Sequence, residues 1–416
     1  MSEKREKQMF WGYIIVAAGF FTGIFIIGQS VVLGMFFKSI SEELGWLRAD
    51  MSVATSIAAV VAGGAAVLGG RLTDKYGPRV VLIGAAVSLA LGYTLLSRIE
   101  ALWQLYIAYG LFVGIVMGCA DVPIVTTVSR WFVRKRGMMV GITKIGAGIG
   151  IMLFPLIANP FMANYGWRRS YLYIGIIVFV GVVAAALFFR RDPAQMKQFP
   201  DGGAMSPLAG QTVQDRHYSV KEAAASRQFW LFAAVWAIFN GCVQAVLLHT
   251  VNHVTDIGLS STLAASIISA IGGSSIVGRF ALASLSDRIG PRVAYLISLS
   301  LLTLAMIWMQ FTQAAWAFYI FAVLYGLAHG GCFALLAPML SHLFGLGSLG
   351  SIMGVIVLCG APGGLIGPVA TGWIFDTTGS YNTAFLIMSI LCLIGVLLIF
   401  LLKPMKAREK VINHAK

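Results

Sequence analysis

Residues 70–80 read Gly-Arg-Leu-Thr-Asp-Lys-Tyr-Gly-Pro-Arg-Val, and residues 283–293 read Ala-Ser-Leu-Ser-Asp-Arg-Ile-Gly-Pro-Arg-Val. Both contain Leu-x-Asp followed by Gly-Pro-Arg-Val, and Asp287 lies 213 residues after Asp74. A self-similarity that keeps one shift over a long stretch indicates that the second half of the chain repeats the first. The same shift relates Gly137 to Gly350, Gly141 to Gly354, Gly150 to Gly363, Pro155 to Pro368 and Gly166 to Gly379.

The composition indicates a chain that lies in a lipid bilayer. Hydrophobic residues make up 58% of the 416 residues and charged residues only 11%, whereas soluble domains carry about 25% charged residues. Twelve apolar runs each approach the ~20 residues of a spanning helix, which is too long for the ~10-residue strands of a membrane barrel. The runs lie near 9–37, 51–70, 80–97, 102–129, 137–161, 171–189, 228–254, 260–284, 293–311, 315–340, 348–374 and 381–402.

The long connection over residues 190–227, which includes a Pro-, Gly- and Ser-rich stretch, separates the two halves. The sequence therefore predicts an all-α integral membrane fold of twelve transmembrane helices in two six-helix bundles related by internal duplication. We expect residues 1–189 to form the first bundle, 190–227 a cytoplasmic central loop, and 228–416 the second bundle with a cytoplasmic tail. Two related bundles commonly enclose one central site and rock against each other in transporters.

Basic residues predict the orientation. Most of the 30 lysines and arginines fall on the side of the membrane that carries both termini, so the positive-inside rule places both termini in the cytoplasm. The formal net charge of +14 is spread over many short loops. We therefore expect the bilayer, and not nucleic acid, as the partner of this charge. The five cysteines fall within predicted helices without paired spacing, which argues against a disulfide framework and a metal site.

The repeated stretch carries a family resemblance. The pattern Gly70-x-Leu72-x-Asp74-Lys75-Tyr76-Gly77-x-Arg79 resembles the loop signature of the major facilitator superfamily. Within that superfamily the chain is similar to the monocarboxylate transporters, which implies a bacterial homologue of the mammalian proton-coupled lactate transporters in the cytoplasmic (inner) membrane. This finer resemblance is carried by Phe36-Phe37-Lys38, Arg130-Trp131-Phe132, Lys135-Arg136-Gly137, Gly166-Trp167-Arg168, Gln228-Phe229-Trp230 and a lone Arg279.

Two positions depart from the monocarboxylate transporter pattern. Val31 stands where those transporters place a lysine, and Ser275 stands four residues before Arg279, where they place an aspartate that carries the coupling proton. The oxalate/formate antiporter family is a near relative that adds a second intramembrane cation, aligned here with Gly360. With Arg279 as the remaining intramembrane cation, a substrate with one carboxylate is favoured over a dicarboxylate.

Arg279 is the leading substrate ligand. An arginine inside a span costs ~2.5–3.5 kcal/mol on insertion scales, so such residues usually face a cavity and mark a pathway. Its planar guanidinium also matches a carboxylate. The alternative is that Arg279 binds a backbone carbonyl of another helix, or extends its side chain toward the inner surface.

Asp121 and Lys144 are expected at similar depths in the helices over 102–129 and 137–161, so they can form a buried ion pair. The pair would neutralise Lys144 and leave Arg279 as the unbalanced charge. The alternative is two unrelated groups near the inner mouth, and buried pairs are often structural. We retain Lys144 as a candidate substrate ligand and Asp121 as a candidate for proton coupling.

His249 and Asp256 share one face near the outer end of the helix over 228–254. Histidine exchanges protons around neutrality, so this face is the predicted proton carrier, unless His249 is a hydrogen-bonded interior residue that never titrates. Amides hold helices together about as often as they bind substrates. With that alternative open, the other candidate substrate ligands are Gln29, Asn240, Tyr325 and His329.

The loop signatures predict gating and not binding. Acids at the cytoplasmic ends of helices can meet the positive end of a following helix or an arginine, and such contacts would hold the inner face shut. The alternative is that these residues only set insertion topology. The candidates are Asp74, Arg79, Arg130, Asp287 and Arg292.

The sequence therefore predicts a secondary active transporter that moves a small monocarboxylate, such as L-lactate or pyruvate, together with a proton by alternating access. It contains no nucleotide loop ending in Lys-Ser/Thr, no HExxH and no GxSxG, so we expect no enzyme activity and no cofactor, with H+ as the driving ion. The expected partners are the carboxylate anion and the proton, without an obligate protein partner. The alternatives are an organic-anion exchanger of the oxalate/formate type and a carboxylate receptor that does not transport.

Overall fold

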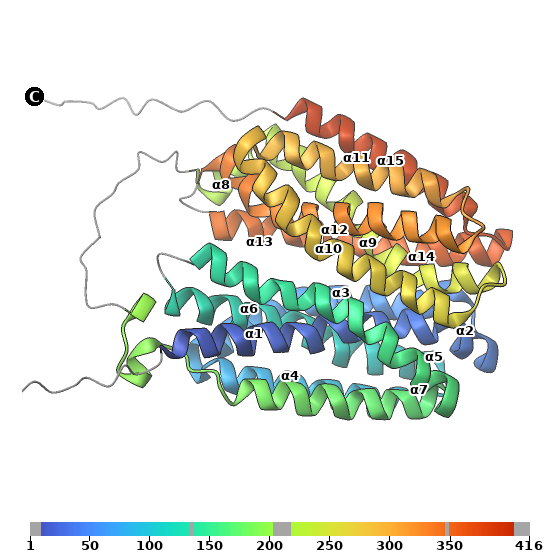
Figure 1. Cartoon of the computed structure of the whole chain (residues 1–416), viewed down its shortest axis with the longest axis horizontal. Helices are drawn as coiled ribbons and strands as arrows, with labels where there is room; N and C mark the ends of the chain where they lie inside the picture. The colour runs from blue at the N-terminus through green and yellow to red at the C-terminus, as the bar shows by residue number, and fades with distance from the viewer. Residues whose placement is uncertain (1–9, 133–135, 203–217, 346–348, 403–416) are drawn as a thin grey trace, which may run out of the picture.

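The computed structural model describes residues 10–132, 136–202, 218–345 and 349–402, and all regular secondary structure in these ranges is helical. The long helices run side by side along the longest axis of the molecule (Figure 1). We call the end at which α1 begins and α15 ends the terminal face, and the opposite end the distal face.

The first half of the chain contains α1 Trp11–Gly28, α2 Val32–Leu44, α3 Arg48–Tyr76, α4 Pro78–Leu96, α5 Leu102–Leu105, α6 Gly114–Trp131 and α7 Arg136–Ala186. Short helices η1 Gln29–Val31 and η2 Tyr106–Val113 join α1 to α2 and α5 to α6 without a break, and η3 Pro193–Met196 and η4 Pro200–Gly202 follow α7. The second half contains α8 Val220–Ala224, α9 Arg227–Asp256, α10 Ser261–Ile289, α11 Pro291–Met309, α12 Ala315–Phe344, α13 Leu349–Cys359, α14 Ala361–Thr378 and α15 Asn382–Leu401.

Eleven helical stretches in the described ranges are long and apolar enough to cross a membrane. The longest, Met138–Ala186, has 49 residues. At 1.5 Å per residue it extends ~74 Å, more than twice the thickness of a bilayer core. Gly166 lies inside it with φ 70° and ψ 167°, which are not helical angles. The stretch therefore consists of two crossings that meet at Gly166, and the predicted all-helical membrane fold is confirmed.

The duplication is visible in the backbone. Helices α3 and α10 have 29 residues each, and both ends of α10 lie 213 residues after the corresponding ends of α3. Positive φ angles, which glycine adopts without a steric penalty, occur at matching positions. They relate Gly45 (67°) to Gly258 (89°), Gly77 (85°) to Gly290 (85°), and Gly166 (70°) to Gly379 (70°).

Helices α1 to α7 pack mainly on one another, as do α9 to α15, and we call these groups the N-terminal and C-terminal bundles. The bundles meet where α3 packs on α14, α7 on α10, and α2 on α9. Gly372 of α14 allows a close approach of the bundles at the distal face, since a Cβ there would lie 2.8 Å from the backbone nitrogen of Ala49. These contacts hold the two bundles together at the distal face.

Candidate functional site

A cluster of charged side chains joins the bundles at the distal face. Arg48, the first residue of α3, donates two hydrogen bonds to the Asp256 carboxylate at the end of α9, with N–O distances of 2.6 and 3.1 Å. Lys38 of α2 lies 2.8 Å from the same carboxylate. The Arg48 guanidinium also stacks on Phe375 at 3.8 Å and donates to the Tyr381 hydroxyl at 2.5 Å. We call Lys38, Arg48, Asp256, Asp376 and Tyr381 the distal latch.

Asp376 of α14 completes the latch by capping a helix of the other bundle. Its carboxylate accepts hydrogen bonds from the backbone nitrogens of Arg48 and Ala49 at 3.1 and 2.8 Å. These two groups belong to the first turn of α3, whose N–H groups have no partner inside the helix. A carboxylate at a helix N-terminus also interacts favourably with the helix dipole. Each bundle therefore supplies a group that the other needs.

His249 lies directly beneath this latch and is fully buried. Its Nε2 is 3.0 Å from the Pro368 carbonyl oxygen and its Nδ1 is 3.2 Å from the Tyr381 hydroxyl. Because a carbonyl oxygen only accepts, Nε2 carries the hydrogen and Nδ1 accepts from Tyr381. In this conformation the neutral imidazole is fully hydrogen-bonded, and Asp256 is held by two cations. The predicted role of His249 and Asp256 as proton carriers stays a prediction.

Three candidate residues lie at one depth closer to the terminal face. Arg279 is ten residues before the end of α10, Asp121 is ten residues before the end of α6, and Lys144 is eight residues after the start of α7. At 1.5 Å per residue, each lies ~12–15 Å from the helix end. The Lys144 ammonium pairs with the Asp121 carboxylate, as the sequence suggested.

This ion pair is not buried, contrary to the sequence-based expectation. The side chains of Lys144 and Asp121 are 40% and 56% exposed. The spacing fixed their depth but not the direction in which they point. Pairs this exposed contribute little to folding stability, about 0–1 kcal/mol. The loss of several kcal/mol that a buried pair would produce is therefore not expected.

Arg279 makes one hydrogen bond, from its Nη1 to the backbone carbonyl of Lys144 at 2.6 Å. This bond connects α10 to α7. It is the contact with a backbone carbonyl of another helix that the sequence analysis gave as an alternative to substrate binding. The guanidinium is not thereby satisfied. Among the described residues its Nε has no hydrogen-bond partner, and none of their ion pairs includes Arg279. A backbone carbonyl leaves the charge available to an anion.

Other candidate residues are distributed between the two bundles. His329 of α12 is buried, interacts electrostatically with Arg279 and stacks on Tyr325, and its Nδ1 has no hydrogen-bond partner in the described part of the chain. Asn240 donates to the Gly360 carbonyl at 2.9 Å, which ties α9 to α14. The Gln29 amide accepts from the Tyr93 hydroxyl at 2.7 Å within the N-terminal bundle, so its oxygen is already engaged.

The predicted gating residues lie at or near helix ends toward the terminal face. Arg130 donates to Asp192 at 3.4 Å, and Arg292 donates to the carbonyls of Ile399 and Phe400 at the end of α15. Arg79 and Asp287 are exposed. The Asp74 side chain lies outside the described part of the structure. Their role in gating stays a prediction.

The latch residues Lys38, Arg48, Asp376 and Tyr381 were not among the sequence-based candidates. Arg48 contacts Asp256 and Tyr381 across 208 and 333 residues of sequence. Lys38 entered the sequence analysis only as part of a family motif, and Arg48 was not singled out. Nothing in their local sequence indicates that they meet acids of the other bundle.

Comparisons with known proteins agree with this architecture. The Major Facilitator Superfamily matches the chain over residues 9–360 and 253–416. Monocarboxylate transporter 13 of Rattus norvegicus is 26% identical, over 92% of this chain and 87% of that transporter. The oxalate:formate antiporter of Oxalobacter formigenes is 27% identical, over 96% of this chain and 92% of that protein.

A solved structure of a bacterial homologue of the human lysosomal transporter Spinster has the same fold. It superposes with a TM-score of 0.76 at 14% sequence identity, over 95% of this chain and 97% of that chain. These matches confirm the resemblance carried by the loop signature and by the finer motifs. They identify a secondary transporter and not an enzyme. The chain belongs to the major facilitator superfamily and is a distant relative of the monocarboxylate transporters and the oxalate:formate antiporter.

Proposed function

We propose that this protein carries a small monocarboxylate, such as L-lactate or pyruvate, across the membrane together with a proton. The observation that carries the proposal is the state of Arg279. Its guanidinium lies where α10 meets α7, bound to one carbonyl and to no acid among the described residues. A carboxylate is the ligand that matches a planar, charged donor of this kind.

The neighbouring charges favour a ligand with one negative charge. Lys144 pairs with Asp121, and Asp121 also attracts Arg279, so these three groups together carry one net positive charge. A dicarboxylate would bring a second negative charge into a region of low dielectric without a second cation. Lys144 supports Arg279 by offering it a backbone carbonyl, and His329, which interacts electrostatically with Arg279, is the proposed partner of the substrate hydroxyl or keto group.

The latch supports alternating access. In this conformation the distal face is closed, and we infer from the distribution of basic residues that the distal face is outside the cell and both termini are cytoplasmic. Opening the outer side requires Arg48 and Lys38 to leave Asp256. The host compartment would be the bacterial inner membrane.

Uptake of labelled lactate into vesicles that contain the purified protein tests this function. We expect an imposed pH gradient to drive accumulation, and Arg279→Ala to abolish it while Arg98→Ala, which removes an exposed arginine at the distal face, does not. Normal uptake by a well-folded Arg279→Ala variant would contradict the assignment. Counterflow without gradient-driven accumulation would favour an oxalate/formate-type exchanger, and binding without flux would favour a receptor.

Proton coupling is tested separately at His249 and Asp256. We expect His249→Gln and Asp256→Asn to retain lactate exchange between equal pools and to lose accumulation driven by a pH gradient, since exchange needs no net proton movement. If both variants accumulate lactate with unaltered pH dependence, these residues hold the structure together and His329 becomes the leading proton carrier.

A further inference from the structure

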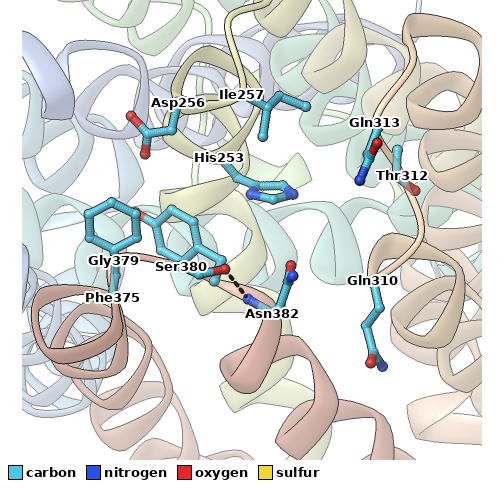
Figure 2. Close-up of a pocket in the computed structure, with 11 residues that line it drawn as sticks. His253, Asp256, Ile257, Gln310, Thr312, Gln313, Phe375, Gly379, Ser380 and Asn382 are labelled. Carbon is cyan, nitrogen blue, oxygen red and sulfur yellow. Dashed lines mark hydrogen bonds between the residues drawn. The ribbon is translucent and has the colours of Figure 1, made fainter.

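A polar pocket of about 170 Å³ lies at the distal face of the C-terminal bundle, shown in Figure 2. A single water needs about 10–15 Å³ of such space, so the pocket holds several. It is bounded by the end of α9, by the connection between α11 and α12, and by the connection between α14 and α15. Lining residues Ile257, Gln313 and Asn382 are exposed, so the pocket is open to the aqueous phase at that face.

His253 lines this pocket and has an unsatisfied ring nitrogen. The side chain is only 6% exposed, and its Nε2 has no hydrogen-bond partner among the described residues. In Figure 2 the imidazole points toward the space between Gln310, Gln313 and Asn382. Its ring packs edge-on against Phe318, Tyr381 and Phe385, with centroid distances of 5.8, 5.6 and 5.2 Å. These contacts fix the ring so that the free nitrogen faces the pocket.

The two histidines of α9 thus differ in their access to water. His249 is fully buried, and both of its ring nitrogens are engaged by groups of the protein. His253 lies one helical turn closer to the distal face, lines the pocket, and has a buried Nε2 without a hydrogen-bond partner among the described residues. A proton from the distal side therefore meets His253 before it can reach His249.

Charged groups of four helices, α9, α3, α2 and α14, lie around His253. Asp256 lies one turn further along α9, and Arg48 of α3 interacts electrostatically with His253 from the other bundle. Lys38 of α2 and the Asp376 carboxylate of α14 face the same cluster through Asp256 and the start of α3. Tyr381 is the remaining titratable group in contact with the ring.

We propose that the pocket is a proton-binding site, and that a proton bound at Nε2 of His253 from the distal side releases the distal latch. The N-terminal bundle contributes two cations to the latch, and the C-terminal bundle contributes two acids. A proton on His253 partly neutralises Asp256 within the C-terminal bundle and places a positive charge near Arg48. Both effects weaken the electrostatic attraction between the two bundles, so acidification favours opening of the distal face.

This inference deepens the proposed proton coupling and rests on it for its role in transport. Its test nevertheless needs neither substrate nor flux. If lactate proves not to be carried, the response of the latch to protons remains measurable, and if the latch ignores protons, the transport assays above still stand. Failure of one proposal is therefore distinguishable from failure of the other.

Spin labels on opposite bundles at the distal face report opening directly. Leu47→Cys and Ser261→Cys place labels on exposed residues before α3 and at the start of α10, and Cys359→Ser removes the partly exposed native thiol. An equilibrium linked to one proton changes by at most about tenfold per pH unit. Between about pH 7.5 and pH 5.5, the range in which histidine exchanges protons, we expect a several-fold rise in the long-distance population.

His253→Gln should abolish this response, because the amide fills similar space but does not titrate. The matched control is His342→Gln, which removes an exposed histidine at the end of α12, toward the terminal face, and should respond as the unsubstituted protein does. His253→Lys, whose amine takes up a proton at higher pH than an imidazole in the same surroundings, should shift opening toward higher pH. A pH response that persists in His253→Gln would overturn the proposal.

Deuterium exchange at the C2 carbon of each histidine tests the site without changing the latch. Exchange proceeds through the protonated ring, so its rate follows protonation and access to water. We expect His253 to exchange with a sigmoidal dependence on pH and faster than His249 and His329, which are enclosed by protein groups. Equal, slow exchange at His253 and His249 would refute the pocket as a proton-binding site, whether or not the variants fold.

Discussion

Arg48→Ala removes the side chain that makes most of the contacts between the two bundles in the distal latch. Its guanidinium donates twice to Asp256, at 2.6 and 3.1 Å, donates to Tyr381 and stacks on Phe375. The side chains of Arg48 and Asp256 are 9% and 18% exposed, so water screens this pair weakly. Asp256, Tyr381 and Phe375 all belong to the C-terminal bundle, whereas Arg48 belongs to the N-terminal bundle. The substitution therefore destabilises the closed state and not the folding of either bundle.

The expected magnitude follows from these contacts. Removing one partner of a buried pair costs about 3–5 kcal/mol. Asp256 keeps Lys38 at 2.8 Å, so it is not left without a cation. We therefore expect the closed state to lose about 2–3 kcal/mol relative to the open state. That corresponds to a change of about 30- to 150-fold in the ratio of closed to open molecules.

The labelled pair at Leu47 and Ser261 measures this ratio at neutral pH. Arg48→Ala should raise the ratio of open to closed molecules by about 30- to 150-fold, whereas Arg98→Ala, which removes an exposed arginine outside the latch, should leave the distribution unchanged. Arg48→Lys should lie between them, since it keeps the charge and loses the two-pronged contact. A distance distribution in Arg48→Ala that matches the unsubstituted protein would refute the latch.

Three further predictions concern the centre and the interface. Because Asp121 and Lys144 are half-exposed, a thermal-stability double-mutant cycle should give a coupling of about 0–1 kcal/mol, and a coupling above about 3 kcal/mol would show that the pair is desolvated. Arg279→Lys should retain measurable lactate uptake with a raised KM while Arg279→Ala retains none, and equal activities would show that the guanidinium geometry is irrelevant. Gly372→Ala should raise the open fraction of the labelled protein, because its Cβ would lie 2.8 Å from the Ala49 nitrogen; an unchanged fraction would mean that α3 shifts without strain.

The helices and the duplication could be predicted because their signals are local or periodic. Apolar runs of spanning length are read directly from the sequence, and one shift of 213 residues aligns turns whose glycines share positive φ angles. The predicted interruption between the helices over 137–161 and 171–189 is present, but it consists of Gly166 alone. The helix continues on both sides of Gly166, because a single glycine can reverse the chain without a loop.

The latch could not be predicted because its members are distant in sequence and ordinary in type. A lysine and an arginine near helix ends are commonplace, and only the packing of the N-terminal bundle on the C-terminal bundle brings Arg48 to Asp256 and Tyr381. Depth along a helix was predictable for Asp121, Lys144 and Arg279, because it depends on counting residues. The exposure of the Asp121–Lys144 pair depends on how the bundles are placed, which counting does not reveal.

The cap that Asp376 places on α3 also determines what opening does to the surrounding water. When the bundles separate, the backbone N–H groups of Arg48 and Ala49 lose their carboxylate, and they need new acceptors because the helix offers none. Solvent must supply these acceptors and hydrate the freed carboxylate and guanidinium, so the open state takes up water. Solutes that are excluded from protein surfaces, such as sucrose, should therefore favour closure in proportion to the osmotic pressure that they exert.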